Sequence, residues 1–219
     1  MARVIMTPDG RRIPLRPVRL YRLTNSGERV TPPPQQRQPI PPRAPAGAKG
    51  RSPGPQPIPS GRSFRVVSPP EDALVTSQLA RELGQVLEQF AQTSGFNQEN
   101  PLTVLFGCGT MGLHKFHRAA DIYAVGGKGV GQWMQEWNAA MRQASATQNP
   151  QERAKIVAEE KGRNLGYKLY KALQAHGGWA QPQGYPVQLF GPWTRSEGPH
   201  KAISDRLLYM HRDHIHIAK

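Results

Sequence analysis

Near the end of the 219-residue chain stands the stretch on which the interpretation of the whole sequence depends: His211-Arg212-Asp213-His214-Ile215-His216-Ile217. Its β-branched residues favour a strand, and side chains two apart on a strand share a face. His214 and His216 should then point one way, while Asp213 and the two isoleucines point the other way, with the isoleucines in the core. Neutral imidazole is a preferred zinc ligand and a nearby carboxylate adds a hard oxygen, so the stretch predicts part of a metal site.

A second group of histidines occurs upstream, in the segment Gly112-Leu113-His114-Lys115-Phe116-His117-Arg118-Ala119-Ala120-Asp121-Ile122. His114 and Asp121 are seven residues apart, and on one straight strand this odd spacing would place them on opposite faces. Residues 115–118 must therefore turn, with His114 on a loop or strand end and Asp121 on the next strand. Ordinary polar surface positions, with Asp213 in a salt bridge, would explain either group alone. The two groups together favour a metal site.

These motifs resemble those of a known family. His114 and Asp121, with Ala119 two residues before the aspartate and Ile122 after it, are similar to the first signature of the LAS zinc peptidases. This group includes D-alanyl-D-alanine carboxypeptidases, phage peptidoglycan endopeptidases, lysostaphin-type enzymes and the zinc fold of hedgehog signalling domains. The spacing His211-x-x-His214-x-His216 resembles the second signature, in the form typical of penicillin-insensitive murein endopeptidases. The resemblance spans roughly residues 70–219.

The resemblance implies a zinc ion held by His114, Asp121 and His216, with a fourth position open for water, as in hydrolytic zinc sites. His214 would be the catalytic base or transition-state stabiliser, and His211 would orient a ligand or the substrate. Asp213 is the competing catalytic residue, because some relatives place a glutamate there; His214 ranks ahead of it.

The chain also departs from the family pattern. His117 replaces a common glycine, so it is an alternative ligand or a substrate contact, and Leu113 replaces a common serine. Trp193 and Tyr209, near the second histidine group, are candidates to line the substrate groove.

Charge and composition divide the chain into a tail and a domain. The protein carries a net charge of +14, yet residues 1–70 alone hold 13 Lys and Arg, two acids and 16 of the 22 prolines. We therefore predict a basic, proline-rich and largely disordered tail over residues 1–65 and a peptidase domain over residues 66–219. Because the basic charge belongs mostly to the tail, nucleic acid is an unlikely partner of the domain.

A single cysteine, Cys108, excludes an intrachain disulfide framework, and no apolar run is long enough for a membrane span.

Periodicity predicts an α+β domain in which a small antiparallel sheet carries the zinc site and packs with helices. A helix after Pro70 has a single apolar stripe and ends at Gly95; the stripe consists of Leu79, Leu83, Val86, Leu87 and Phe90. Strands are expected at 102–106 and 119–125, helices at about 130–146 and 150–175, and a last strand or pair of strands at 206–217.

An apolar patch around Val18 and Leu23 predicts a further strand or docking segment. The glycines around Lys128 lack the spacing of a phosphate loop and predict a strand-to-helix turn.

The sequence thus predicts a zinc-dependent peptidoglycan peptidase, either an endopeptidase or a carboxypeptidase. Its partners would be peptidoglycan peptides and a protein that binds the proline-rich tail; the basic tail would be attracted to the polyanionic wall. With no signal peptide recognised at the start of the chain, we expect synthesis in the cytoplasm and delivery to the wall by non-classical export, lysis or a virion. Two alternatives remain open: a non-catalytic zinc-binding interaction module of the same fold, and a metal-dependent nuclease toxin suggested by total charge alone.

Overall fold

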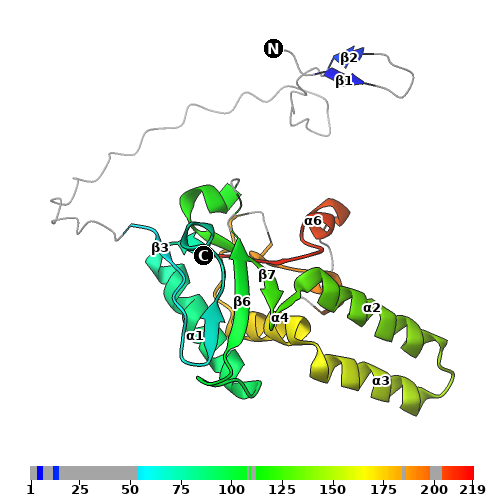
Figure 1. Ribbon diagram of the computed structural model, residues 1–219. Coiled ribbons are helices and arrows are strands. Elements are labelled where there is room, and N and C mark those ends of the chain that lie inside the picture. Colours follow the sequence, from blue (N-terminus) through cyan, green and yellow to red (C-terminus); the bar gives the residue numbers. More distant parts are fainter. Residues whose placement is uncertain are drawn as a thin grey trace, which may run out of the picture. The chain divides into compact units, whose positions relative to one another are not determined.

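The computed structural model describes residues 4–6, 12–14, 54–107, 109, 112–183, 186–197 and 204–219 (Figure 1). The chain divides into two compact units, Met1–Ala48 and Lys49–Lys219. In the first unit, β1 (Val4–Met6) pairs antiparallel with β2 (Arg12–Pro14), so a short hairpin occurs within the predicted tail. The apolar patch predicted around Val18 and Leu23, and Cys108, lie outside the described residues.

The second unit has the predicted mixed α+β fold. Its strands are β3 (Gln56–Pro57), β4 (Phe64–Val66), β5 (Leu74–Val75), β6 (Leu102–Gly107), β7 (Ala119–Val125), β8 (Lys128–Gly129), β9 (Leu189–Phe190) and β10 (Ile215–Ala218). Its helices are η1 (Pro70–Ala73), α1 (Ser77–Thr93), η2 (Gly112–Phe116), α2 (Val130–Ala146), α3 (Pro150–Arg163), α4 (Leu165–His176), α5 (Thr194–Glu197) and α6 (Asp205–Met210). None of the helices within the described ranges combines the length and apolar character that a membrane crossing requires.

The main sheet has the strand order β4-β6-β7-β10-β9, with β8 added to β7. Its pairs are antiparallel except β4 and β6, which run parallel because the long connection through η1 and α1 separates them. The two central strands, β7 and β10, have Asp121 opposite His216. The two predicted metal ligands that lie in the sheet, Asp121 and His216, are therefore directly opposite each other on neighbouring strands.

Alternation along β7 and β10 assigns the two faces of the sheet. Ile122 on β7 and Ile215 and Ile217 on β10 are buried in the core, together with the apolar stripe of α1 and with Leu169 and Leu173 of α4. Asp121 and His216 belong to the opposite face. The helices α1 and α4 thus stabilise one face and leave the other for polar side chains. Trp133 and Trp137 of α2 are also buried in this core.

Two predicted elements differ from the structure. The helix predicted over about 150–175 is broken at Asn164, whose carboxamide accepts from the Tyr167 backbone N–H and donates to the Trp133 carbonyl and to Glu160. The strand predicted from residue 206 is the helix α6 up to Met210, because the Ser204 hydroxyl caps this helix by accepting from the Leu207 N–H. Only the last three residues of the predicted strand, Ile215 to Ile217, lie in β10, which Ala218 completes.

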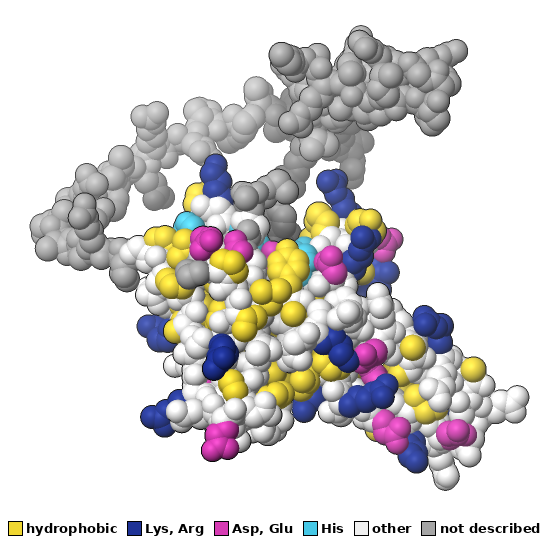
Figure 2. Space-filling view, in the orientation of Figure 1, with side chains coloured by type: hydrophobic (Ala, Val, Ile, Leu, Met, Phe, Trp, Pro, Cys, Tyr) yellow, Lys and Arg dark blue, Asp and Glu magenta, His cyan; other side chains and the backbone are white. Residues whose placement is uncertain are grey.

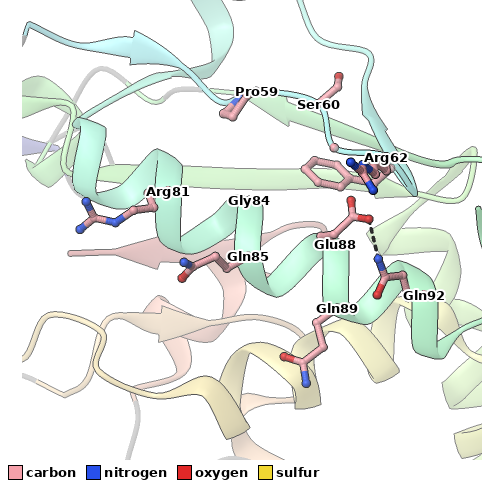
Figure 3. Close-up of a pocket in the computed structure, with 11 residues that line it drawn as sticks. Pro59, Ser60, Arg62, Arg81, Gly84, Gln85, Glu88, Gln89 and Gln92 are labelled. Carbon is pink, nitrogen blue, oxygen red and sulfur yellow. Dashed lines mark hydrogen bonds between the residues drawn. The ribbon is translucent and has the colours of Figure 1, made fainter. Parts of the chain in front are cut away.

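The domain boundary predicted at residue 65 falls inside the second unit. Ile58 is only 3% exposed and belongs to the core, and β3 pairs with β5. Residues 59–64 then pass over α1, where Glu88 accepts hydrogen bonds from Ser63 and Gln92, beside a pocket of about 620 Å³ (Figure 3). The fold therefore uses residues that composition assigned to the tail.

A truncation series tests this boundary. Because Lys49 begins the second compact unit, we expect a chain that starts there to melt at the same temperature as the full-length protein. A chain that starts at Phe64 lacks β3 and Ile58, and burial of an isoleucine side chain is worth about 2–5 kcal/mol by alanine substitution. We expect its melting temperature to fall by several degrees. Equal melting temperatures for the two truncations, measured by calorimetry, would restore the boundary at residue 65.

Candidate metal centre

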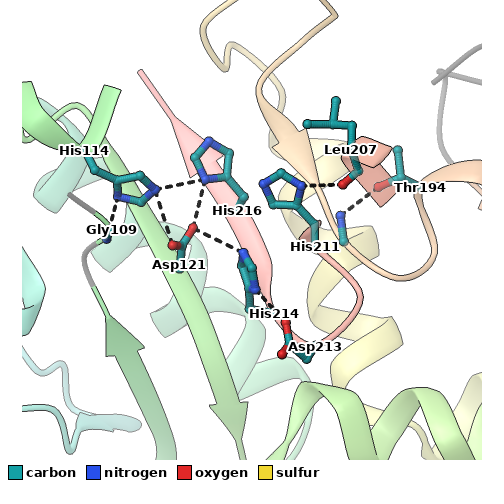
Figure 4. Close-up of polar contacts among 10 residues, drawn as sticks. Gly109, His114, Asp121, Thr194, Leu207, His211, Asp213, His214 and His216 are labelled. Atoms are coloured by element: carbon teal, nitrogen blue, oxygen red, sulfur yellow. Dashed lines mark hydrogen bonds and ion pairs between the residues drawn. The ribbon is translucent and has the colours of Figure 1, made fainter. Parts of the chain in front are cut away.

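Three elements bring the predicted ligands together. His114 lies in η2, and His117 then turns the chain with a positive φ of 55° before β7 begins. Asp121 comes from β7 and His216 from its cross-strand partner β10. The turn that the odd spacing between His114 and Asp121 required is therefore present, and all three side chains converge on the face of the sheet opposite the helices (Figure 4).

The spacing of the three side chains suits a tetrahedral ion. His114 Nε2 lies 3.2 Å from His216 Nδ1 and 3.3 Å from Asp121 Oδ2, and His216 Nδ1 lies 2.8 Å from Asp121 Oδ1. Zinc bonds of about 2.0–2.1 Å at tetrahedral angles put neighbouring donor atoms about 3.3 Å apart. Among the described residues, these three form a group that could hold a metal ion. We call them the metal triad.

The metal triad is nearly closed to solvent. The side chains of His114, Asp121 and His216 are only 9%, 7% and 10% exposed. Burial acts to raise the pKa of Asp121, but hydrogen bonds and positive charge from His114 and His216 outweigh it and hold this pKa well below its usual range. The carboxylate is therefore ionised, as a metal ligand must be.

His214 lies beside the metal triad and is oriented by Asp213. Its Nε2 is 3.8 Å from Asp121 Oδ1, and its Nδ1 is 2.9 Å from Asp213 Oδ1 (Figure 4). Sequence alternation predicted that Asp213 would point away, but β10 begins only at Ile215, so Asp213 and His214 precede the strand and their side chains meet. Because an ionised carboxylate only accepts, Nδ1 carries a proton, and Nε2 is the ring nitrogen that faces the metal triad.

His211 closes the opposite side of the same cluster. Its ring centroid lies 5.0 Å from that of His214 and 5.1 Å from that of His216. Burial lowers the pKa of His211 to about 4, against the opposing effect of a 2.8 Å bond from Nδ1–H to the Leu207 carbonyl. The imidazole is thus neutral at physiological pH. Its ring proton is on Nδ1, and Nε2 carries none.

The other candidates do not join the triad. His117 Nδ1 lies 3.2 Å from the Leu74 carbonyl, and His117 is not a member of the metal-binding group. Trp193 is fully buried among aromatic residues, so it does not line a groove, whereas Tyr209 is 65% exposed. Tyr123, which the sequence motifs did not indicate, has its ring centroid 5.1 Å from that of His214. It lies two residues after Asp121 on the same face of β7, and this spacing could have revealed it.

Comparison of the chain with protein-family models, with curated proteins and with solved structures found no match. What the protein does therefore has to be inferred from the chemistry of the site.

One contact must change when a metal binds. Asp121 accepts from His114 and His216, so the facing atoms His114 Nε2 and His216 Nδ1 carry protons in the metal-free protein. A metal would replace both protons, and the neutral His114 ring would then be protonated at Nδ1. That atom accepts the Gly109 N–H at 3.2 Å, and this bond would be lost.

The loss predicts a spectroscopic signal. In amide NMR spectra, one equivalent of zinc should shift the Gly109 resonance strongly, whereas Gly95, in the turn after α1, should not move. An unchanged Gly109 resonance beside a tightly bound metal would show that His114 does not coordinate through Nε2.

Proposed function

We propose that this chain is a zinc-dependent peptidase that hydrolyses peptide bonds of bacterial peptidoglycan. The observation that carries the proposal is the metal triad together with His214, whose Nε2 faces the triad from 3.8 Å without belonging to it. Three protein ligands and an adjacent base are the parts of a hydrolytic zinc site, whereas structural sites use four protein ligands. Zinc suits two imidazoles and one carboxylate better than calcium or magnesium, which prefer oxygen ligands alone.

The protein's own groups would divide the chemistry as follows. A zinc ion held by His114, Asp121 and His216 supplies a Lewis acid that polarises the scissile carbonyl and acidifies water. His214 accepts a proton at Nε2 and returns it to the leaving amine, while Asp213 holds the Nδ1–H tautomer. His211, kept neutral by burial, fixes the position of the His214 and His216 rings.

The substrate class comes from the resemblance of the two motifs to the LAS peptidases. The site itself supports hydrolysis of a polarised carbonyl, and peptidoglycan peptides are the substrates that the resemblance implies. Action at the cell wall follows from that substrate.

Metal analysis and product analysis test the proposal together. The purified full-length chain should hold one zinc per molecule and should release peptide fragments from purified peptidoglycan, with masses that locate the bond cut. Removal of the metal with a chelator should stop the release, and added zinc should restore it. A metal-loaded chain that releases no fragment would contradict the peptidase proposal.

A non-catalytic zinc-binding module is the second candidate, and the low exposure of the triad favours it. Such a module would bind zinc as tightly as the enzyme but would leave peptidoglycan intact.

A further inference from the structure

A cleft of about 490 Å³ is lined in part by Arg212, the residue that follows His211 in the chain. Its lining comes from α2, from Pro192 in the turn after β9, from α5, and from α6 with the residue after its cap. The residues that matter to the argument are Trp137, Asn138, Arg195, Ser196, Tyr209 and Arg212. This volume lies in the range of about 300–1,000 Å³ that small-ligand sites occupy, so the cleft has room for more than one amino-acid residue.

The cleft is continuous in the chain with the metal centre. Arg212 stands between His211 and Asp213, and α6, which carries Tyr209, ends at His211. On the other wall, β9 pairs with β10 so that Phe190 lies opposite His216, and the lining of the cleft begins two residues later at Pro192. A peptide whose scissile bond lies at the metal triad can therefore extend into this cleft along α6.

Two guanidinium groups give the cleft a positive charge. The Arg212 guanidinium carbon lies 3.9 Å from the centroid of the exposed Tyr209 ring, and within the described part of the chain Arg212 forms no ion pair. Arg195 pairs with Asp205, whose side chain is 90% exposed. Exposed ion pairs are weak and screened by salt, so an anionic ligand can compete for Arg195.

The remaining surface of the cleft complements a peptide. Trp137 and Leu208 provide apolar surface, and the Asn138 amide and Ser196 hydroxyl can hydrogen-bond a peptide backbone. Figure 2 shows one face of the molecule, on which histidine side chains lie among hydrophobic, basic and acidic ones. Guanidinium groups bind carboxylates with charge-assisted hydrogen bonds, so the preferred peptide carries a negative charge.

We propose that this cleft binds an acidic segment of the peptide substrate, with Arg212 as the main contact to a side-chain or α-carboxylate next to the scissile bond. The proposal rests on the proposed function, because it assigns the substrate of that same site. The size of the cleft indicates a segment of peptide rather than a single terminal residue, which favours endopeptidase action.

Two peptides that differ in one carboxylate test the cleft. The zinc-loaded full-length chain is assayed on a peptide with a glutamate next to the scissile bond and on the same peptide with glutamine. We expect kcat/KM to be at least about tenfold higher for the acidic peptide, since a hydrogen bond to a charged group is worth about 1.5–3 kcal/mol. Arg212→Gln should remove this preference by raising KM for the acidic peptide alone, and Arg212→Lys should retain part of it.

The matched control is Arg142→Gln, an exposed arginine on the far end of α2, which should keep the preference. Equal loss on both peptides in Arg212→Gln would mean that Arg212 only supports the fold of the site, and would overturn the proposal. Equal kcat/KM values for the two peptides with the unaltered protein would also overturn the cleft proposal, but they would leave the peptidase function intact.

Binding to the zinc-loaded His214→Ala variant, followed by calorimetry, separates the two proposals. If no peptide is hydrolysed by the unaltered chain, yet the acidic peptide binds this variant more tightly than the neutral one and Arg212→Gln abolishes the difference, the peptidase function fails and the cleft assignment stands. If neither peptide binds, the cleft assignment fails.

Discussion

Replacing His216 with alanine should abolish tight zinc binding by the full-length chain. His216 Nδ1 lies within 3.2 Å of both other donor groups, and the metal triad has three members, so the variant keeps only two. Even residues that only orient a ligand are worth about 10–100-fold in metal affinity, and removal of a ligand itself should cost more than 100-fold. Metal analysis after dialysis should find about one zinc per chain in the unaltered protein and close to none in the variant.

Thermal melting gives a second measurement that does not depend on activity. A ligand present at 100 times its Kd stabilises the folded state by about 2.7 kcal/mol, so zinc should raise the melting temperature of the unaltered chain by several degrees. The same zinc concentration should not change the melting temperature of His216→Ala. The matched control is His176→Ala, a histidine at the end of α4 that pairs with Glu82, and it should keep both zinc and the shift. Stoichiometric zinc in His216→Ala would remove this residue from the site.

The two histidine motifs could be predicted from local patterns, whereas the choice of His114, Asp121 and His216 as ligands came from the resemblance to the LAS peptidases. The odd spacing from His114 to Asp121 required a turn, and the alternation of β-branched residues at the end of the chain fixed the face of His216. What could not be predicted was the register that pairs Asp121 with His216, since a sequence does not show which residues of two strands lie opposite each other. The sequence therefore indicates which residues form the metal triad. The distances between their donor atoms depend on the strand register, which only the fold shows.

The failures have equally specific causes. Sequence alternation was extended back to Asp213, but β10 begins at Ile215 because the chain first completes the cap of α6. Gly162 and Gly166 flank the break at Asn164 without fixing its position; the break depends on hydrogen bonds to the Trp133 carbonyl and to Glu160. The boundary near residue 65 failed because Ile58, in a proline-rich segment, is buried in the core. The errors at Asn164 and Ile58 lie where tertiary contacts decide against a local pattern.

Replacing His214 with alanine should leave zinc near one equivalent while removing most hydrolysis. His214 is outside the metal triad, yet its Nε2 is 3.8 Å from Asp121 Oδ1 and its ring lies beside Tyr123. A positioned general base contributes about 10²–10⁴-fold to rate, and kcat should fall by a factor in this range with little change in KM. Zinc content and the zinc-dependent melting shift are the control measurements, because a variant that also lost its metal would report on binding and not on proton transfer.

Asp213→Asn distinguishes the two assignments of the base. The Asp213 side chain is 60% exposed, and it contacts Nδ1 of His214, on the opposite edge of the ring from the metal triad. From there it can hold the tautomer but cannot reach a substrate placed at the triad, so Asp213→Asn should lose less activity than His214→Ala. His211→Ala should also retain more activity than His214→Ala, since His211 is fixed by the Leu207 carbonyl and has no ligand role. If Asp213→Asn is inactive while His214→Ala turns over at a near-normal rate, the carboxylate is the base, and the Nδ1–H tautomer assigned to His214 is wrong.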